Sequence, residues 1–220
     1  MEIGEEFISL IQPYTKSSPQ RIRGMAKAVM YVDRFGVPGD IVECGVWRGG
    51  NIILSRKLSP DRTCWLYDTY RGMTKPCEWD TTRSGHPASI SYEKKQVRGA
   101  GWAACSLEDV QINLIETDTY HDDKLKFIVG DVIETLQRPE NIPDQIAVLR
   151  LDTDWYQSTK VELQKLWPRL SPNGVLIIDD YGHWLGARKA TDEYFANEAG
   201  VAFEGVEIDY TAVMMVKPCL

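Results

Sequence analysis

The sequence predicts an α/β fold in which helices cover both faces of a mostly parallel sheet. From Gly39 onward, apolar runs of strand length alternate with segments of helical periodicity. Two of these runs end in pairs of aspartates, a pattern typical of buried parallel strands that meet at one edge of a sheet. Two further apolar runs flank a short polar turn near Asp209, which predicts a C-terminal antiparallel hairpin.

The expected elements follow in chain order. Strands are predicted at 40–44, 63–67, 125–129, 146–151, 174–179, 202–206 and 212–216. Helices are expected at about 49–58, 106–115, 132–136, 157–170 and 184–196. The helix over 157–170 should end at a turn formed by Ser171-Pro172-Asn173-Gly174.

Residues 5–36 precede this pattern and predict two amphipathic helices, interrupted near Pro13 and at Ser17-Ser18-Pro19. The second helix, over about 19–35, should end before Gly36. We interpret residues 1–38 as a helical extension that serves packing or subunit contact, not catalysis. Residues 39–220 then form the main domain.

A long insertion separates the second and third strands, at about 74–123. Such a length exceeds the short connections usual in alternating α/β units. Near its end, Ser106-Leu107-Glu108-Asp109 has the pattern of a capping box that opens a helix. We expect the insertion to be a mobile lid over a site. The alternative is a surface loop without a role.

Composition narrows the class of protein. The 220 residues carry a net charge of -7, with 43% hydrophobic and 26% charged residues, which is ordinary for a soluble domain. The absence of a basic stripe argues against a nucleic-acid partner, and no apolar run approaches the ~20 residues that span a membrane. The acidic start of the chain is unlike a signal peptide, so we expect a cytoplasmic protein. The five cysteines include no Cys-x-x-Cys pair, which argues against a zinc or redox site.

Four aspartates follow the fourth and fifth strands: Asp152, Asp154, Asp179 and Asp180. If the two strands are neighbours, these carboxylates converge, and their repulsion favours raised pKa values or a bound cation. Hard oxygen ligands suit Mg²⁺ or Ca²⁺, and Mn²⁺ also fits. The alternative is that the aspartates cap the helices that follow. Arg150 either offsets some of this charge or pairs with a glutamate on a helix.

A glycine-rich turn follows the first strand, in Glu43-Cys44-Gly45-Val46-Trp47-Arg48-Gly49-Gly50. Its spacing differs from Gly-x-Gly-x-x-Gly, which disfavours a dinucleotide cradle. Asp68 at the end of the second strand is suitably spaced to bind ribose hydroxyls. Gly130-Asp131 after the third strand places another acid where an adenine could lie. Together these residues indicate a nucleoside ligand.

Three motifs resemble one family. The glycine turn, Leu151-Asp152-Thr153-Asp154-Trp155-Tyr156 and Ile178-Asp179-Asp180-Tyr181-Gly182 are similar to those of the macrocin O-methyltransferases (TylF/MycF type), over about 39–194. The resemblance implies a Rossmann-like class I methyltransferase fold with a seven-stranded sheet. It also implies S-adenosylmethionine and Mg²⁺ as cofactors and a sugar hydroxyl of a natural product as the acceptor.

The resemblance also implies site residues. The metal ligands would be Asp152, Asp179 and Asp180. The S-adenosylmethionine site would comprise Glu43, Gly45, Val46, Trp47, Asp68, Thr69, Ser106, Gly130, Asp131 and Asp152.

Methyl transfer to a hydroxyl needs an aligned oxygen and a base that takes its proton. Asp154 is the first candidate base, because the two-residue period of a strand would keep it on the same side as Asp152. His183 is the second candidate, although it could simply form a hydrogen bond at the start of a helix. We expect one or two of four aromatics to contact the acceptor: Trp155, Tyr156, Tyr181 and Trp184.

Two alternative functions remain at this point. A nicotinamide-dependent oxidoreductase shares the strand–glycine–helix start and the acid after the second strand. A non-catalytic binding module could keep the same fold. For the methyltransferase we expect a small-molecule acceptor and a homo-oligomer, in particular a dimer.

Overall fold

The computed structural model describes residues 3–97 and 101–219. Its centre is a seven-stranded sheet in the order β3-β2-β1-β4-β5-β7-β6. The strands are β1 (Asp40–Cys44), β2 (Cys64–Asp68), β3 (Leu125–Val129), β4 (Ile146–Leu151), β5 (Leu170–Ile178), β6 (Val206–Glu207) and β7 (Val213–Val216). The predicted α/β fold class is confirmed, and β4 and β5 are parallel neighbours as the acidic motifs required.

Strands β1 to β5 pair in parallel, whereas β7 pairs antiparallel with both β5 and β6. The predicted C-terminal hairpin is therefore confirmed. Its first strand is shorter than expected and begins at Val206 instead of residue 202. The physical reason is Phe203, whose ring packs 4.9 Å from that of Phe195, so this residue contacts the core beside α8 instead of pairing in the sheet.

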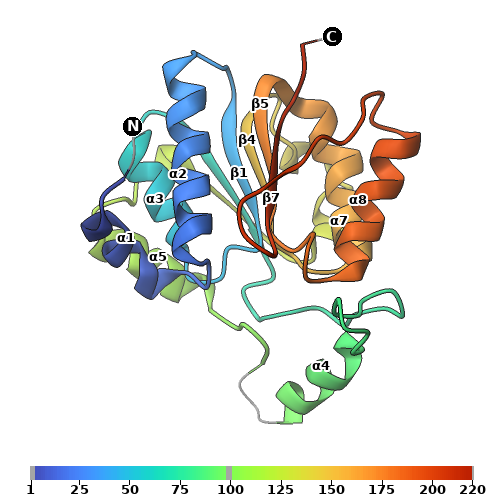
Figure 1. Ribbon diagram of the computed structural model, residues 1–220. Helices are drawn as coiled ribbons and strands as arrows, with labels where there is room; N and C mark the ends of the chain where they lie inside the picture. The colour runs from blue at the N-terminus through green and yellow to red at the C-terminus, as the bar shows by residue number, and fades with distance from the viewer. Residues whose placement is uncertain (1–2, 98–100, 220) are drawn as a thin grey trace.

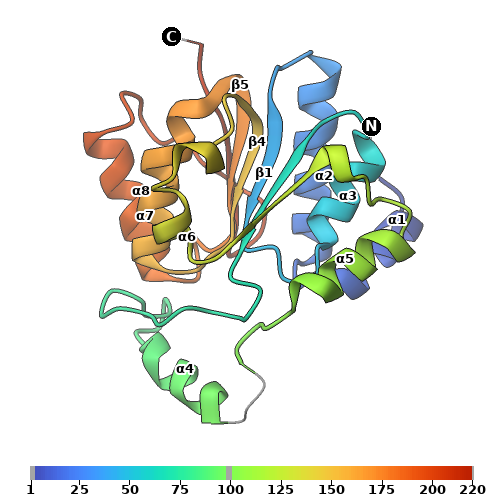
Figure 2. The same ribbon diagram turned by 180° about the vertical axis from the view of Figure 1, so that it is seen from behind.

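Helices cover both faces of the sheet (Figure 1). One face carries α1 (Glu5–Ile11), α2 (Pro19–Arg34), α3 (Gly50–Leu58) and α5 (Leu107–Glu116). The other carries α6 (Val132–Thr135), α7 (Tyr156–Leu166) and α8 (Leu185–Asn197), with α6 clearest from behind (Figure 2). Among the described residues, no helix is both long and apolar enough to cross a bilayer.

Each face of the sheet has its own hydrophobic core. Successive residues of a strand point to opposite faces, and β1 shows this: Ile41 belongs to the core that includes Met25 of α2, whereas Val42 belongs to the core that includes Leu163 of α7. The N-terminal helices therefore share a core with the sheet. The division at residue 38 stays a prediction.

The turn predicted at Ser171-Pro172-Asn173-Gly174 is wrong. Helix α7 ends at Leu166, and β5 runs through this segment as an irregular stretch. Asn173 has φ +63°, and its N–H donates to the carbonyl of Lys217 at 2.8 Å. These residues form a bulge, because the pairing with β4 passes directly from Leu170 to Val175.

The insertion between β2 and β3 contains one helix that the sequence did not predict, α4 (Ala88–Val97). Figures 1 and 2 both place α4 beneath the body of the fold, at the edge where the parallel strands end. The two arms of the insertion run together near the sheet, where the Met73 N–H donates to the Trp102 carbonyl at 2.8 Å.

Candidate active site

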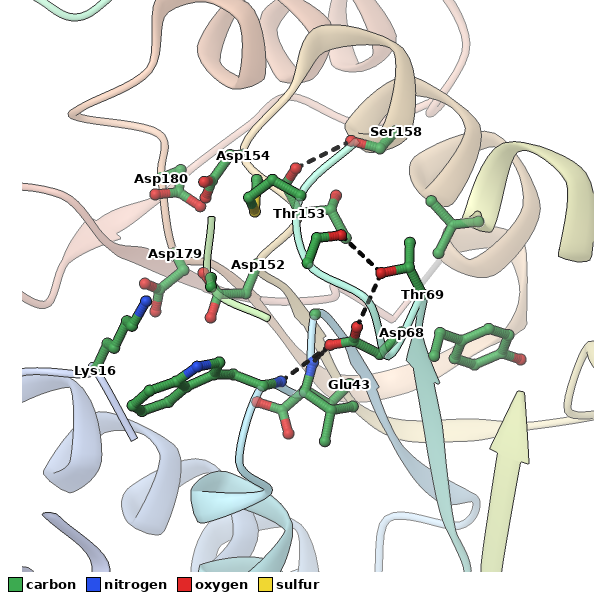
Figure 3. Close-up of a pocket in the computed structure, with 18 of the residues that line it drawn as sticks. Lys16, Glu43, Asp68, Thr69, Asp152, Thr153, Asp154, Ser158, Asp179 and Asp180 are labelled. Carbon is green, nitrogen blue, oxygen red and sulfur yellow. Dashed lines mark hydrogen bonds between the residues drawn. The ribbon is translucent and has the colours of Figure 1, made fainter. Parts of the chain in front are cut away.

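A cavity of about 310 Å³ lies at the carboxyl ends of the parallel strands (Figure 3). All but one of the predicted site residues line it: Glu43, Gly45, Val46, Trp47, Asp68, Thr69, Gly130, Asp131, Asp152, Asp154, Asp179, Asp180 and His183. Ser106 lies outside this lining. It is exposed, and its hydroxyl caps α5 in the predicted capping box with Asp109. Its contact with a cofactor stays a prediction.

The glycine turn after β1 passes close to the loop after β4. Gly45 has φ +86°, and a Cβ at this position would lie 2.0 Å from the Asp152 carbonyl oxygen. A side chain would therefore clash as well as strain the backbone. The Asp152 N–H donates to the Cys44 carbonyl at 2.8 Å, which continues the sheet pairing into the site.

The carboxylate of Asp68 holds the glycine turn. Its Oδ2 accepts from the N–H groups of Val46 and Trp47 at 2.8 and 3.0 Å, and its Oδ1 accepts from that of Tyr70 at 2.8 Å. Burial raises the pKa of Asp68, while these N–H donors oppose the rise. Asp68 thus shapes the loop as well as lining the cavity, and its contact with a ribose stays a prediction.

The residues after β3 also combine a glycine of positive φ with an aspartate that accepts from a backbone N–H. Gly130 has φ +138°, and Asp131 accepts from the Ile133 N–H at 2.9 Å, which caps the short helix α6. Asp131 therefore caps a helix. We had considered this role as the alternative for the acids after the fourth and fifth strands. It does not describe those other aspartates, because the residues at the caps of α7 and α8 are Trp155 and Trp184.

Arg150 neutralises part of the acidic cluster, as one of the two alternatives predicted. It is buried, and its guanidinium lies 2.6 Å from Glu43 Oε1, 2.8 Å from Asp152 Oδ2 and 2.6 Å from Asp179 Oδ1. Burial is the main cause that raises the pKa of Glu43 to about 7, and Arg150 opposes this rise. One guanidinium thus links β1, β4 and the end of β5.

The N-terminal segment, which we interpreted as a packing or subunit-contact element without a catalytic role, also lines the cavity. Arg21 of α2 pairs with Asp179 and lies 3.1 Å from Asp209. Lys16 also lines the cavity and rests over the Trp47 ring at 4.6 Å. Arg21 could have been noticed, because it begins the helical stripe that continues at Met25 and Val29.

Asp152, Asp154 and Asp180 form a compact acidic group (Figure 3), in which one oxygen of each lies within 4.8 Å of the others. Asp154 does not reach this position by the strand periodicity we assumed, since β4 ends at Leu151 and Asp154 has φ +69°. A left-handed turn of the backbone places it beside Asp152 instead. Asp179, the other predicted ligand, has an arginine on each carboxylate oxygen.

The chemistry of this group fits a hard divalent cation, which prefers carboxylate oxygens. Within the described part of the chain, Asp180 Oδ2 is buried without a hydrogen-bond partner. Burial is the main cause that raises the pKa values of Asp152, Asp154 and Asp180, and the neighbouring aspartates add to it. The pKa of Asp154 reaches about 7. A cation would offset this crowding of negative charge.

His183 and several aromatics border the same end of the cavity. Burial lowers the pKa of His183, and Arg21 lowers it further. Of the four aromatics predicted near the acceptor, Trp184 lines the cavity, and Trp102 of the insertion, which we did not predict, lines it as well. Trp155 is buried against both of these rings, with centroids 5.7 Å from Trp102 and 5.1 Å from Trp184.

The doubly covered sheet, its antiparallel final strands and the cavity at the ends of β1, β2 and β4 define a class I methyltransferase fold. The solved structure of the O-methyltransferase NovP matches it with a TM-score of 0.81 and 31% identity, covering 94% of this chain and 83% of that one.

The profile of the family Macrocin-O-methyltransferase (TylF) matches residues 11–217. The chain belongs to this family of S-adenosylmethionine-dependent enzymes and is an O-methyltransferase. The resemblance inferred from the three motifs is thereby confirmed, and the oxidoreductase and non-catalytic alternatives are excluded.

Two relatives have named substrates. Mycinamicin III 3''-O-methyltransferase of Micromonospora griseorubida is 35% identical over 217 residues, which cover 96% of this chain and 81% of that protein. The 8-demethyl-8-(2,3-dimethoxy-alpha-L-rhamnosyl)-tetracenomycin-C 4'-O-methyltransferase of Streptomyces olivaceus is 34% identical over 205 residues, which cover 91% of this chain and 74% of that protein.

Proposed function

We propose that this enzyme methylates one hydroxyl of a vicinal diol on a sugar of a natural product, with the help of Mg²⁺. The observation that carries the proposal is the acidic group of Asp152, Asp154 and Asp180 at one end of the cavity. The glycine turn and Asp68 lie in the same cavity and suit a nucleoside donor. The named substrates of the two relatives support a glycosylated acceptor.

S-adenosylmethionine would lie along the ends of β1, β2 and β3. Gly45 lets the backbone approach the donor, and Asp68, with three N–H donors on its oxygens, keeps the turn in shape. The ribose would meet Asp68, and the adenine would lie near Gly130 and Asp131. This arrangement would direct the methionine end of the donor toward the acidic group.

Asp152 and Asp180 are the metal ligands common to the sequence prediction and the geometric group. For the third ligand, the sequence predicts Asp179 and the geometry favours Asp154, because both oxygens of Asp179 already accept from arginines. We therefore propose Asp154 as the third ligand. When bound, the cation would lower the pKa of the acceptor hydroxyl and hold it in place.

His183 is then our proposed base. Its lowered pKa keeps the imidazole neutral near pH 7, so that it can accept a proton. It lies in the loop that follows Asp180 and lines the same cavity. Trp102 and Trp184 would wall the acceptor, since their flat apolar faces suit the C–H faces of a sugar ring.

The experiment is a metal titration of single variants. Asp180→Asn should lose Mg²⁺-dependent turnover while still binding S-adenosylhomocysteine by calorimetry. Asp154→Asn should weaken the binding of Mn²⁺, a paramagnetic substitute for Mg²⁺, more than Asp179→Asn does, and the reverse order would restore Asp179 as the third ligand. The exposed Asp123→Asn is the control. Full activity in excess EDTA would refute the metal-dependent mechanism.

Three further expectations stay predictions. They are the homodimer, the cytoplasmic location, and the action of the insertion over 74–123 as a mobile lid. The arms of the insertion border the cavity through Met73, Thr74 and Trp102, which supports a role at the site.

A further inference from the structure

We infer that Asp80, in the insertion, is a positioning residue that holds two loops of the active site in register. The first acidic loop is 152–155, between β4 and α7, and the second acidic loop is 179–184, between β5 and α8. Asp80 itself does not line the cavity. The metal-binding test of this inference rests on the proposed function, whereas a second test does not.

Asp80 is buried although it belongs to a surface insertion, with 1% of its area exposed. Its Oδ1 accepts from the N–H of Tyr156 at 2.8 Å, and its Oδ2 accepts from the N–H of Cys77 at 2.7 Å. Its backbone carbonyl accepts from the Ala88 N–H at 2.8 Å, at the start of α4. Both oxygens of this buried carboxylate have a hydrogen-bond donor, which indicates a specific contact in the fold.

Through Tyr156, Asp80 caps helix α7 from a distant part of the chain. Tyr156 is the first residue of α7, and its neighbour Trp155 provides no side-chain cap among the described residues. A carboxylate at the N-terminus of a helix satisfies a free N–H and interacts favourably with the helix dipole. The insertion also holds Trp155 directly, because the indole Nε1–H donates to the Thr74 carbonyl at 3.0 Å.

This cap acts on the first acidic loop because Tyr156 follows Asp154 by two residues. Asp154 has φ +69°, a conformation that costs free energy for a residue with a side chain. Such a turn persists only when its surroundings hold it. The contacts of Asp80 and Thr74 with the residues after Asp154 provide that restraint.

The same segment of the insertion holds the second acidic loop. The Thr81 carbonyl accepts from the Leu185 N–H at 2.8 Å, and the Arg83 N–H donates to the His183 carbonyl at 2.9 Å. Gly186, at the start of α8, packs so closely that a Cβ there would lie 1.9 Å from Asp80 Oδ1. Asp80 therefore lies between the first turns of α7 and α8.

The two loops carry Asp154 and Asp180, whose oxygens must converge for the acidic group to form. Figures 1 and 2 show the insertion passing beneath the ends of α7 and α8, where both loops lie. One segment of chain thus contacts both loops on the side away from the sheet. Loss of its central contact should let the acids move apart.

Two independent variants test this contact. Asp80→Ala removes the acceptor, whereas Gly186→Ala keeps it but displaces it with a methyl group. Asp80→Asn should be intermediate, because its amide oxygen can still accept from Tyr156. Ser171→Ala is the matched control. The buried hydroxyl of Ser171 donates to the Pro38 carbonyl at 2.7 Å, at the amino end of β5 and away from the cavity.

The first readout is Mn²⁺ binding, measured by electron paramagnetic resonance in the presence of S-adenosylhomocysteine. We expect Asp80→Ala and Gly186→Ala to weaken Mn²⁺ binding at least tenfold and to change S-adenosylhomocysteine affinity less than threefold. Ser171→Ala should change neither. Wild-type Mn²⁺ affinity in both Asp80→Ala and Gly186→Ala would overturn the inference, and if Asp80→Ala fails to fold, Gly186→Ala decides.

The second readout needs no metal. Amide hydrogen exchange in 152–156 and 180–185 should be at least tenfold faster in Asp80→Ala and Gly186→Ala than in the wild type and in Ser171→Ala. Unchanged exchange in these loops would overturn the inference even if the wild type binds Mn²⁺. If the wild type binds no Mn²⁺ but exchange accelerates as expected, the proposed metal centre fails and the role of Asp80 stands.

Discussion

Arg150 and Glu43 face each other across β4 and β1, where the strand register pairs the two residues and their side chains lie 2.6 Å apart. Both are buried, and Arg150 also pairs with Asp152 and Asp179. The arginine is thus the centre of the charge network beneath the cavity. Both the stability of the fold and the geometry of the site should therefore depend on Arg150.

Arg150→Met should destabilise the protein by about 3–5 kcal/mol, because it leaves buried carboxylates without their cation. Urea unfolding at pH 7 measures this loss. The exposed Arg169→Met serves as the control and should change the free energy of unfolding by less than about 0.5 kcal/mol. A loss below about 1 kcal/mol in Arg150→Met would show that the network does not stabilise the fold.

Glu162 should make stability depend on pH. It is buried on α7, where its Oε1 accepts from the Thr153 hydroxyl at 2.9 Å, and burial raises its pKa from 4.5 to about 8. The folded state binds a proton on the Glu162 carboxyl group more tightly than the unfolded state does. The stability that this proton provides is therefore fully present below pH 4.5 and is lost as the pH rises toward 8.

Glu162→Gln cannot ionise at this position. The free energy of unfolding of the variant minus that of the wild type should therefore be larger at pH 9 than at pH 5. Each pKa unit corresponds to about 1.4 kcal/mol, so we expect a relative gain of about 3–5 kcal/mol. Urea unfolding at the two pH values measures it, with the exposed Glu140→Gln as the control. A pH dependence equal to that of the wild type would contradict the assignment.

Gly45→Ala should abolish donor binding and destabilise the fold by about 3 kcal/mol or more, because the new Cβ would meet the Asp152 carbonyl as well as strain the backbone. Gly200→Ala separates the two effects: Gly200 has φ +74°, but no atom of the described residues, apart from its direct neighbours, lies within 4 Å of a Cβ there. We expect it to cost about 1–2 kcal/mol and to leave S-adenosylhomocysteine binding unchanged in calorimetry. Equal behaviour of the two variants would refute the close approach at Gly45.

His183→Gln should lower kcat by about 10²–10⁴-fold, the usual contribution of a general base. Because the pKa of His183 is lowered from 6.5, the wild type should keep its activity at pH 7 and lose it as the pH falls below that ordinary value. The matched variant is His86→Gln, an exposed histidine of the insertion. If His183→Gln retains both the rate and the acid limb of the profile, Asp154 returns as the candidate base.

Much of the cavity lining after β1, β2 and β3 could be predicted, because its residues follow strands that the apolar pattern already locates. Gly45, Asp68 and Asp131 each lie at the end of a parallel strand, and such ends meet at one edge of a sheet. The pairing of β4 with β5 then brings Asp152 close to Asp179. A local sequence signal sufficed for these residues.

Other parts of the site gave no local signal that indicated their partners. The charge of Arg21 reaches Asp179, which lies 158 residues away in sequence. Asp80 lies in a stretch without periodicity, and its partner Tyr156 is 76 residues away. Asp154 joins the acidic group through a left-handed backbone, whereas our prediction assumed an extended strand.

The sequence by itself determined the succession of strands and helices along the chain, apart from α4. It also determined the glycine turn and the acidic motifs, since each depends on neighbours a few residues away. Only the tertiary structure decided which carboxylates form the acidic group, which arginines neutralise the remainder, and which segment caps α7. These outcomes depend on contacts between distant segments, whose side chains meet only after the sheet and its helices have packed. Charge balance in a buried site is a property of the assembled fold, and no short stretch of sequence contains it.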